Sequence, residues 1–143
     1  MRWLVLDEVK MIQKKKIAST RSRVPAGSIS PQLLMMEMMA QTGALLLGAE
    51  KDFEEDLIFA KIDQADFNDI GLTGEVIEIE ATSENLRPEG AWLEGTIRSR
   101  ERIVAQSRFL LMNVGHFIPG QVKSFTFHDR FMDYFQVREK IQA

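Results

Sequence analysis

Alternating apolar and polar positions predict strands in the second half of the chain. In residues 75–82 and 92–98, apolar or small side chains alternate with charged or polar ones. Such alternation is typical of a strand with one buried face. Residues 57–63 and 103–114 are more continuously apolar and also predict strands. Because the stretches before 92 and 103 are short and polar, we expect hairpins and an antiparallel order.

The most apolar stretch of the chain predicts one long buried helix. Pro31 fits the first helical position and Ser30 the N-cap, and the helix is expected to run to about Ala49. Leucine and methionine occupy every face of this helix, which is typical of a helix that is buried all round. A sheet wrapped around one central helix is the simple way to bury it.

The two ends of the chain complete the predicted order of elements. Residues 3–9 and 11–21 are expected to form two strands before the helix, and residues 24–28 a loop. After Val114 the sequence becomes irregular, and residues 129–142 predict an amphipathic helix with aromatic side chains on one side. This α+β pattern predicts one domain over 1–114. The extension, 115–143, is expected to pack on the same domain or on a dimer partner.

Composition narrows the function classes. The 143 residues suit a single domain, and the net charge of −3 gives no general reason to expect nucleic acid or an anionic membrane as a partner. The absence of cysteine excludes disulfides and thiolate chemistry. With only His116 and His128 as histidines, we expect no metal site and no cofactor. No stretch suits a bilayer span or a signal peptide, so a cytoplasmic location is expected.

Glu37 is the residue most suggestive of chemistry, because it is the only charge between Pro31 and Ala49. Burial of an unpaired carboxylate is costly, and such a group tends to become neutral. A carboxyl group held near neutrality can act as an acid or base. Gln41 lies four residues later on the same helical face, where its amide can hold the carboxyl group. The alternative is a structural carboxylate, bonded to a backbone amide or to a partner chain.

The segment from Arg23 to Gln41 resembles the active-site stretch of the hotdog-fold 3-hydroxyacyl-acyl-carrier-protein dehydratases. Their pattern of His-Phe-Pro-Gly, then Pro-Gly, then a helix with Glu and Met-Ala-Gln aligns here without a gap. The matching residues are Pro25, Ile29, Pro31, Glu37, Met39, Ala40 and Gln41. Weaker likeness continues through residues 59–67, 74–75 and 102–105, so that it covers roughly residues 3 to 114.

This resemblance implies a hotdog fold, in which an antiparallel sheet wraps around the central helix, and a homodimer or higher even oligomer. It also implies an acyl-carrier-protein or coenzyme A thioester as the ligand, bound in an apolar tunnel beside Glu37. In the resembled family the acidic residue of the helix helps the hydroxyl group to leave. Backbone amides at the helix start hold the carbonyl oxygen. The expected substrate-binding residues are Arg23, Gln32, Gln41, Met36, Phe59 and Ile62.

The sequence departs from the family at two positions of the site. The catalytic histidine of the family falls on Arg23, and the glycine after the helix-start proline falls on Gln32. Arginine cannot take the histidine's place as a base, because its guanidinium group does not lose a proton in proteins. A second Gly-His-Phe segment at residues 115–120 contains His116. It is more simply a coincidence, unless the C-terminal segment folds back over Glu37.

Three functions therefore stay open. The chain is a dehydratase-like protein of fatty-acid-type metabolism with impaired dehydration, a thioesterase that uses Glu37, or a non-catalytic acyl-binding protein or partner subunit. The run Lys14, Lys15 and Lys16 is most simply a solvated hairpin. Alternatively, these lysines act with Arg21 and Arg23 as a docking patch for an acidic carrier protein or for the phosphates of coenzyme A.

Overall fold

The computed structural model describes residues 5–27, 30–50, 53, 57–113 and 129–142. Its elements in chain order are β1 (Glu8–Gln13), β2 (Ile17–Arg23), α1 (Pro31–Glu50), β3 (Leu57–Phe67), β4 (Val76–Arg87), β5 (Gly90–Ser99), β6 (Arg102–Asn113), α2 (Asp129–Tyr134), η2 (Val137–Lys140) and β7 (Ile141–Gln142). The described strands form one sheet in the order β3-β6-β5-β4-β2-β1-β7. Neighbouring strands are antiparallel, except that β7 runs parallel to β1.

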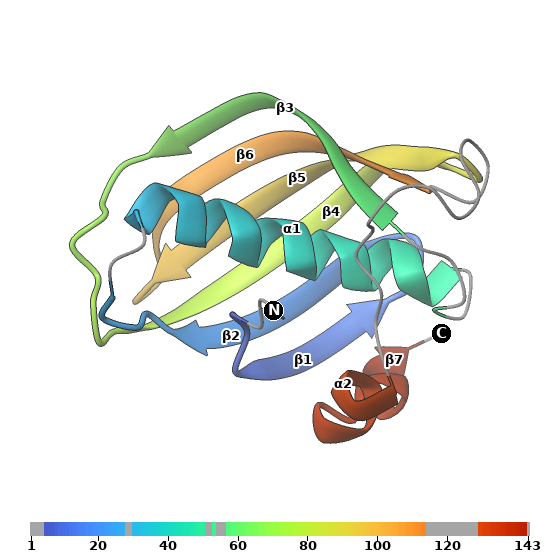
Figure 1. The fold of residues 1–143 in the computed structure, drawn as a ribbon, viewed down its shortest axis with the longest axis horizontal. Coiled ribbons are helices and arrows are strands. Elements are labelled where there is room, and N and C mark those ends of the chain that lie inside the picture. Colours follow the sequence, from blue (N-terminus) through green and yellow to red (C-terminus); the bar gives the residue numbers. More distant parts are fainter. Residues whose placement is uncertain (1–4, 28–29, 51–52, 54–56, 114–128, 143) are drawn as a thin grey trace.

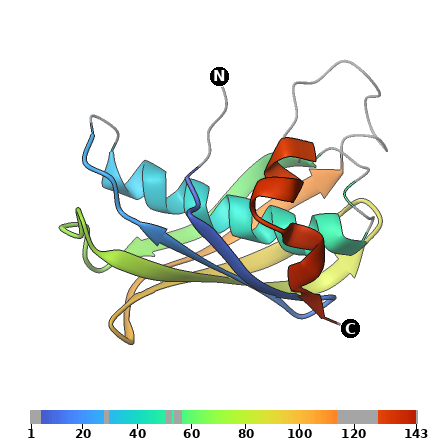
Figure 2. The same cartoon turned by 90° about the horizontal axis from the view of Figure 1, so that it is seen from below.

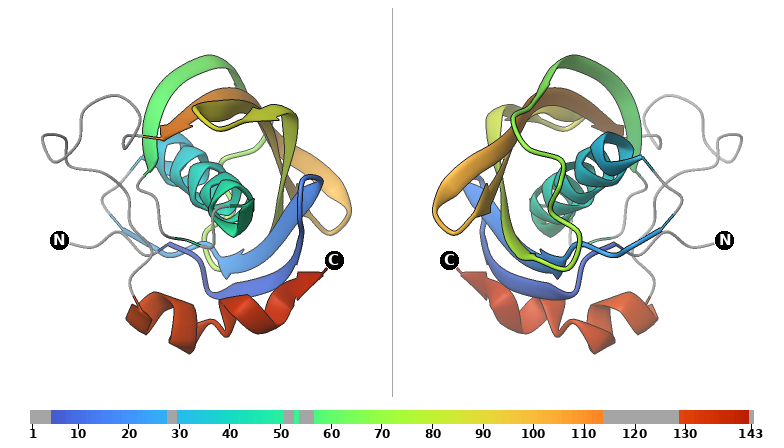
Figure 3. Two further views of the ribbon diagram at one scale, coloured as in Figure 1. Left: turned by 90° about the vertical axis from the view of Figure 1, so that its right-hand side faces the viewer. Right: turned by 90° about the vertical axis from the view of Figure 1, so that its left-hand side faces the viewer.

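The sheet curves around α1, which lies across it in Figure 1 and is seen nearly end-on in Figure 3. The helix begins at Pro31 as the sequence predicts, and it ends one residue beyond the predicted Ala49. Nearly every side chain from Leu34 to Ala49 is buried, with Glu37 as the exception. The expectation of a hotdog fold with one central buried helix is confirmed.

Close contacts fix α1 against the concave face of the sheet. The hydroxyl groups of Thr42 and Thr20 lie 2.8 Å apart in the core and join α1 to β2. On β5, Gly95 leaves room for Met39, because a Cβ atom there would lie 2.8 Å from two atoms of the methionine side chain. These contacts determine the rotation of the helix, and with it the direction in which Glu37 points.

The first two strands lie later in the chain than predicted. Residues 3–9 and 11–21 were expected as strands, whereas β1 covers Glu8–Gln13 and β2 covers Ile17–Arg23. The lysines form the turn between them, and Lys15 has a positive φ of 65°. A solvated turn suits three consecutive lysines, because each ammonium group stays in water. The expectation that the lysines form a solvated hairpin is confirmed. The prediction of one continuous strand over residues 11–21 is wrong.

The prediction of a single helix over residues 129–142 is also wrong. α2 ends at Tyr134, Gln136 adopts a left-handed conformation with a φ of 51°, and the chain continues as η2 and β7. The aromatic side is nevertheless buried, since Phe131, Phe135 and Val137 belong to the core. Figure 2 shows this segment against β1, and β7 pairs with the end of that strand. The division of the chain at residue 114 stays a prediction.

The two edges of the sheet differ. β1 is covered by β7 and the C-terminal segment, whereas β3 pairs only with β6 among the described residues. The eleven-residue β3 therefore leaves one long edge of backbone groups unpaired. No helix in the described ranges is long and apolar enough to cross a membrane.

Candidate functional site

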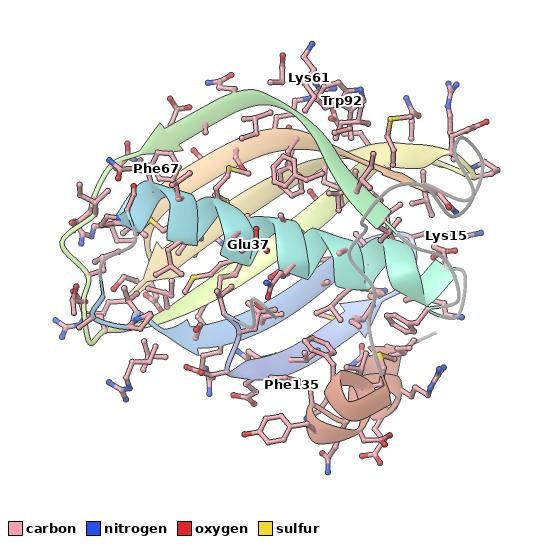
Figure 4. The ribbon with its side chains drawn as sticks, in the orientation of Figure 1. Lys15, Glu37, Lys61, Phe67, Trp92 and Phe135 are labelled. Carbon is pink, nitrogen blue, oxygen red and sulfur yellow. The ribbon has the colours of Figure 1, made fainter. Side chains whose placement is uncertain are left out.

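Glu37 lies in the second turn of α1, on the face that points away from the sheet (Figure 4). Its carboxyl group accepts a hydrogen bond from Gln41, with 3.0 Å between Nε2 and Oε1. The amide oxygen of Gln41 in turn accepts a bond of 3.4 Å from the backbone N–H of Val5. The expected contact between Glu37 and Gln41 is thus present, and it holds the carboxyl group in one orientation.

Glu37 is only partly buried in the single chain. The sequence predicts a fully buried carboxyl group, because apolar residues surround it on the helix. The difference arises because the sheet covers only part of the helix surface. Leu33, one turn before Glu37, is likewise 67% exposed. A half-buried carboxyl group, held in place by an amide, is accessible to a ligand.

A pocket of about 150 Å³ opens beside this carboxyl group. It lies between α1 and the adjoining ends of β3 and β6, and its lining residues are Glu37, Ala40, Gln41, Ala44, Leu57, Ile58, Phe59 and Leu111. The space exists partly because Ala40 and Ala44 are small and lie one helical turn apart. Apolar walls with a few polar groups at one end are typical of a small-molecule site.

The structure brings only part of the predicted site together. Phe59 lines the pocket and stacks against Phe109, with 5.6 Å between the ring centroids. Ile62 is 47% exposed on β3 and does not line it. Met36 is buried but is not in the lining either. Methionines were expected to line the tunnel, but they fill the core instead, and Met39 for example contacts Ser107.

Arg23 and Gln32 lie near the two ends of the connection between β2 and α1. The Arg23 guanidinium donates a hydrogen bond of 2.6 Å to the carbonyl of Gly74, and the Arg23 backbone N–H donates to Asp7. The Gln32 side chain accepts a hydrogen bond of 2.9 Å from Ser30. Neither residue lines the pocket beside Glu37. Their roles in binding therefore stay predictions.

His116 and His128, and with them the Gly-His-Phe segment, lie outside the described residues. Within the described ranges no group of three or more metal-ligating side chains comes together. Among the described residues, this site offers the carboxyl group of Glu37 and the amide of Gln41 for chemistry, beside apolar walls.

The basic residues proposed as a docking patch lie at opposite ends of β2. The lysine turn precedes β2 and Arg23 ends it, so that about seven residues, or roughly 20 Å of strand, separate them. Arg21 is engaged in ion pairs with Glu8 and Glu78 at 3.2 and 3.0 Å. The lysines and Arg23 therefore cannot contact one compact anion together, while a docking patch for a carrier protein stays a prediction.

Five lining residues were not predicted from the sequence: Ala40, Ala44, Leu57, Ile58 and Leu111. The spacing of the two alanines was a usable signal, because Ala40 and Ala44 lie four residues apart and therefore share a helical face. That face adjoins the one that Glu37 and Gln41 share. The strand residues carried no such signal. Their place in the pocket follows from the pairing of β3 with β6, which joins distant parts of the chain.

Comparison with known proteins gives relatives at low identity, and no family model matches the chain. A bifunctional LpxC/FabZ enzyme of Chlorobaculum tepidum is 29% identical over 111 residues, which cover 73% of this chain and 24% of that enzyme. A 3-hydroxyacyl-acyl-carrier-protein dehydratase FabZ of Clostridium tetani is 25% identical over 121 residues, which cover 76% of this chain and 85% of that enzyme. The match to a FabZ of Caulobacter sp. strain K31 covers 57% of that enzyme's length.

Solved structures establish the fold. The dehydratase heterocomplex ApeI:P of Xenorhabdus doucetiae matches with a TM-score of 0.64 at 16% identity, over 77% of this chain and 82% of that one. The smu.793 protein of Streptococcus mutans, bound to acetyl CoA, matches with 0.65 at 12%, over 79% and 92%. A hypothetical thioesterase of Streptococcus pneumoniae with coenzyme A matches with 0.61 at 12%, over 74% and 84%.

The curved sheet around one helix places the chain among hotdog-fold proteins. In sequence the chain is similar, at low identity, to FabZ dehydratases, and in fold it is similar to dehydratases and thioesterases alike.

Proposed function

We propose that this protein binds acyl thioesters, carried by acyl carrier protein or by coenzyme A, in the pocket beside Glu37. The observation that carries the proposal is the geometry of that pocket. A carboxyl group and an amide, joined by a hydrogen bond, face a mostly apolar cavity between α1 and β3. The apolar walls suit an acyl chain, and the two polar groups suit the thioester end.

The relatives support this choice of ligand. The sequence relatives include dehydratases named for 3-hydroxyacyl-acyl-carrier-protein substrates, and the structural neighbours include proteins with coenzyme A or acetyl CoA. The proposal includes the carrier, which is acyl carrier protein or coenzyme A, and a role in fatty-acid-type metabolism.

Within this proposal the protein is dehydratase-like, with impaired dehydration. The reaction needs a base for the proton next to the thioester carbonyl. The aligned residue Arg23 cannot supply one, since a guanidinium group stays protonated. A positioned base contributes typically about 10²–10⁴-fold to a rate, so its loss without replacement lowers dehydration by a comparable factor.

Thioester hydrolysis is the second candidate. It is favoured by the position of Glu37, which is partly exposed and oriented by Gln41 at the mouth of an apolar pocket. A carboxylate so placed can activate a water molecule or attack the carbonyl carbon without a histidine. If neither reaction occurs, the same pocket serves acyl binding alone, in a partner subunit for example.

We also propose a homodimer that is joined through β3. This strand has a free edge, and Phe59 and Ile62 on it are 38% and 47% exposed. Pairing of two β3 strands satisfies their backbone groups and covers these side chains. Leu33, which is exposed on α1, is a further apolar side chain for such a partner to cover.

Assay of the purified protein with enoyl, 3-hydroxyacyl and saturated acyl thioesters tests the proposal. We expect hydrolysis or tight binding of acyl thioesters, with little hydration of enoyl thioesters. Glu37→Gln should lower any turnover by about 10²–10⁴-fold, since it removes the ionisable group and keeps the shape. Glu89→Gln, in the exposed turn between β4 and β5, is the matched control and should leave turnover unchanged. Absence of both binding and turnover with every thioester would refute the proposal.

A further inference from the structure

A second pocket, of about 220 Å³, lies at the C-terminal end of α1 and contains an unusual carboxyl group. Oxygen Oε1 of Glu50 is buried and has no hydrogen-bond partner in the described part of the protein. A buried acceptor without a donor is costly, and such groups in native proteins commonly have a ligand or a water molecule as their partner.

The position of Glu50 on the helix increases this cost. It is the last residue of α1, and the last turn contains no basic residue. The C-terminal end of a helix has a partial negative charge from its free carbonyl groups, so a carboxylate there is unfavourable and a cation or hydrogen-bond donor is favourable. The missing partner of Glu50 is therefore a donor.

The walls of the second pocket are mainly apolar. Its lining residues are Leu47, Gly48, Glu50, Leu57, Leu86, Arg87, Pro88, Gly90 and Asn113. Figure 1 shows the C-terminal end of α1 and the turn between β4 and β5 at the same end of the molecule. Arg87 is exposed, and no ion pair joins it to Glu50 within the described ranges. The guanidinium group therefore leaves the carboxyl group open to a ligand.

The two pockets adjoin each other. Leu57 lines both, with Glu37 in the first pocket and Glu50 in the second. Along α1, Ala40, Ala44 and Gly48 recur every four residues and leave a lane of small side chains between them. Glu50 lies thirteen positions after Glu37, which corresponds to about 20 Å along the helix. An extended acyl chain can therefore reach from the first carboxyl group to the second, past Leu57.

We propose that the second pocket holds the far end of the acyl chain, and that Glu50 selects chains whose last carbon bears a hydroxyl or amino group. This inference rests on the proposed function, because the thioester end must lie beside Glu37. An apolar tunnel alone would not favour chains with such a polar end. The ligand's donor would supply the hydrogen bond that Oε1 of Glu50 lacks.

Isothermal titration with thioether analogues of acyl-pantetheine tests the inference, since these ligands contain the arm common to both carriers and cannot be hydrolysed. Three ligands with the same chain length are compared: a hexadecanoyl analogue, whose extended chain is about as long as the helix between Glu37 and Glu50, its form with a terminal hydroxyl group, and its form with a terminal carboxyl group. We expect the hydroxylated ligand to bind about tenfold more tightly than the plain one, as a hydrogen bond to a charged group permits. The terminal carboxylate should bind most weakly.

Two variants locate the effect. Glu50→Leu should remove the preference and raise the melting temperature, because it removes the unsatisfied oxygen. Leu86→Trp changes a residue that lines only the second pocket and should fill it, so that the hexadecanoyl ligands lose affinity while a butanoyl analogue still binds. Glu89→Gln is the control carboxylate in the neighbouring turn, and it should keep the preference.

The outcomes separate this inference from the proposed function. Equal binding of the plain and hydroxylated ligands overturns the inference, and so does a preference for the terminal carboxylate, while binding of the butanoyl analogue leaves the proposed function standing. If the preference survives in Glu50→Leu, Glu50 is not the selecting group and the inference fails. If not even the butanoyl analogue binds, the proposed function fails, and the inference fails with it.

Discussion

Arg23 is the residue that most separates this protein from the dehydratases it resembles. Its guanidinium group is bonded to the carbonyl of Gly74, and its backbone N–H to Asp7. The end of β2 is therefore held by contacts that a histidine side chain in place of Arg23 would only partly retain. The position aligns with the family's base, but its present contacts are structural.

Arg23→His tests whether the backbone at that position still follows the family. If it does, the imidazole can act as a base together with Glu37, and hydration of an enoyl thioester should rise above the wild-type rate. Spectrophotometric hydration assays over pH 6–9 measure this, because neutral imidazole predominates above its usual pKa of about 6.5. Arg21→His, two residues earlier on β2, is the control. Fast hydration by the unmodified protein would contradict our view of the site, and His116 would then be the first residue to replace.

Gly95 is a residue at which packing fixes the direction of Glu37. A methyl group there would lie 2.8 Å from both Cβ and Sδ of Met39. Gly95→Ala should therefore destabilise the fold by about 1–3 kcal/mol, as overpacking of a core does. Gly27→Ala is the control, because nothing lies within 4 Å of the Cβ position there. Equal urea midpoints for the two variants would show that the core beside Met39 accommodates the added methyl group without loss of stability.

At the scale of elements, the sequence predicts most of the sheet and the whole of α1. Pro31 marks the start of the helix, and the continuous apolar run marks its burial. Two local conformations were not predictable, since Lys15 and Gln136 have positive φ without being glycine. The first ends β1 and the second ends α2. Neither residue type signals such a turn, and the contacts of the folded chain decide it.

The same limit applies to the pocket. A helix that is apolar on every face gives no periodicity from which to infer which side faces the sheet. Methionines were therefore expected in the lining, and the structure places alanines there instead. The carboxyl group and its amide partner were predictable, because they are the polar exceptions in the run and lie four residues apart.

Strands β1, β2 and β4 are joined on the surface by ion pairs centred on Glu78. Lys10 from β1 and Arg21 from β2 contact its two carboxyl oxygens at 2.9 and 3.0 Å. Desolvation raises the pKa of Glu78, but the hydrogen bonds from Lys10 and Arg21 outweigh it and lower that pKa below its ordinary value of 4.5. The folded state therefore binds this proton less readily than the unfolded chain does.

A lowered pKa in the folded state stabilises the protein above the unfolded value. The stabilisation should be complete above about pH 4.5 and should disappear as the pH falls through the lower folded value. Because the pairs are largely exposed, Glu78→Gln should cost only about 0.5–1 kcal/mol at pH 7. Urea unfolding at pH 7 and pH 3 measures the difference, with Glu94→Gln on β5 as control. A difference that is the same at both pH values would contradict this account.

At the scale of the whole molecule, the sheet has one covered edge and one free edge. The C-terminal segment covers β1 through β7, and β3 is open. This asymmetry favours a closed pair over an open chain of subunits, because only one edge can accept a second copy. In such a pair, β3 and the exposed side of α1 lie near the interface, close to Glu37.

Ile62→Asp tests the expected dimer. A carboxylate on the free strand should be left unpaired when two copies meet, so that the dimer dissociates. Light scattering at micromolar concentration should show a dimer for the wild type and a larger monomer fraction for the variant. Ile103→Asp replaces a comparably exposed isoleucine on β6 and should leave the dimer intact. A monomeric wild type would refute the dimer itself.

The most direct test of the central claim is a crystal structure of the protein with a thioether analogue of an acyl-pantetheine. The account predicts that the thioether sulfur of the ligand lies beside Glu37 and Gln41, and that its alkyl chain runs between Ala40, Ala44 and Phe59. A ligand bound elsewhere on the protein, with this pocket empty at saturating concentration, would contradict it.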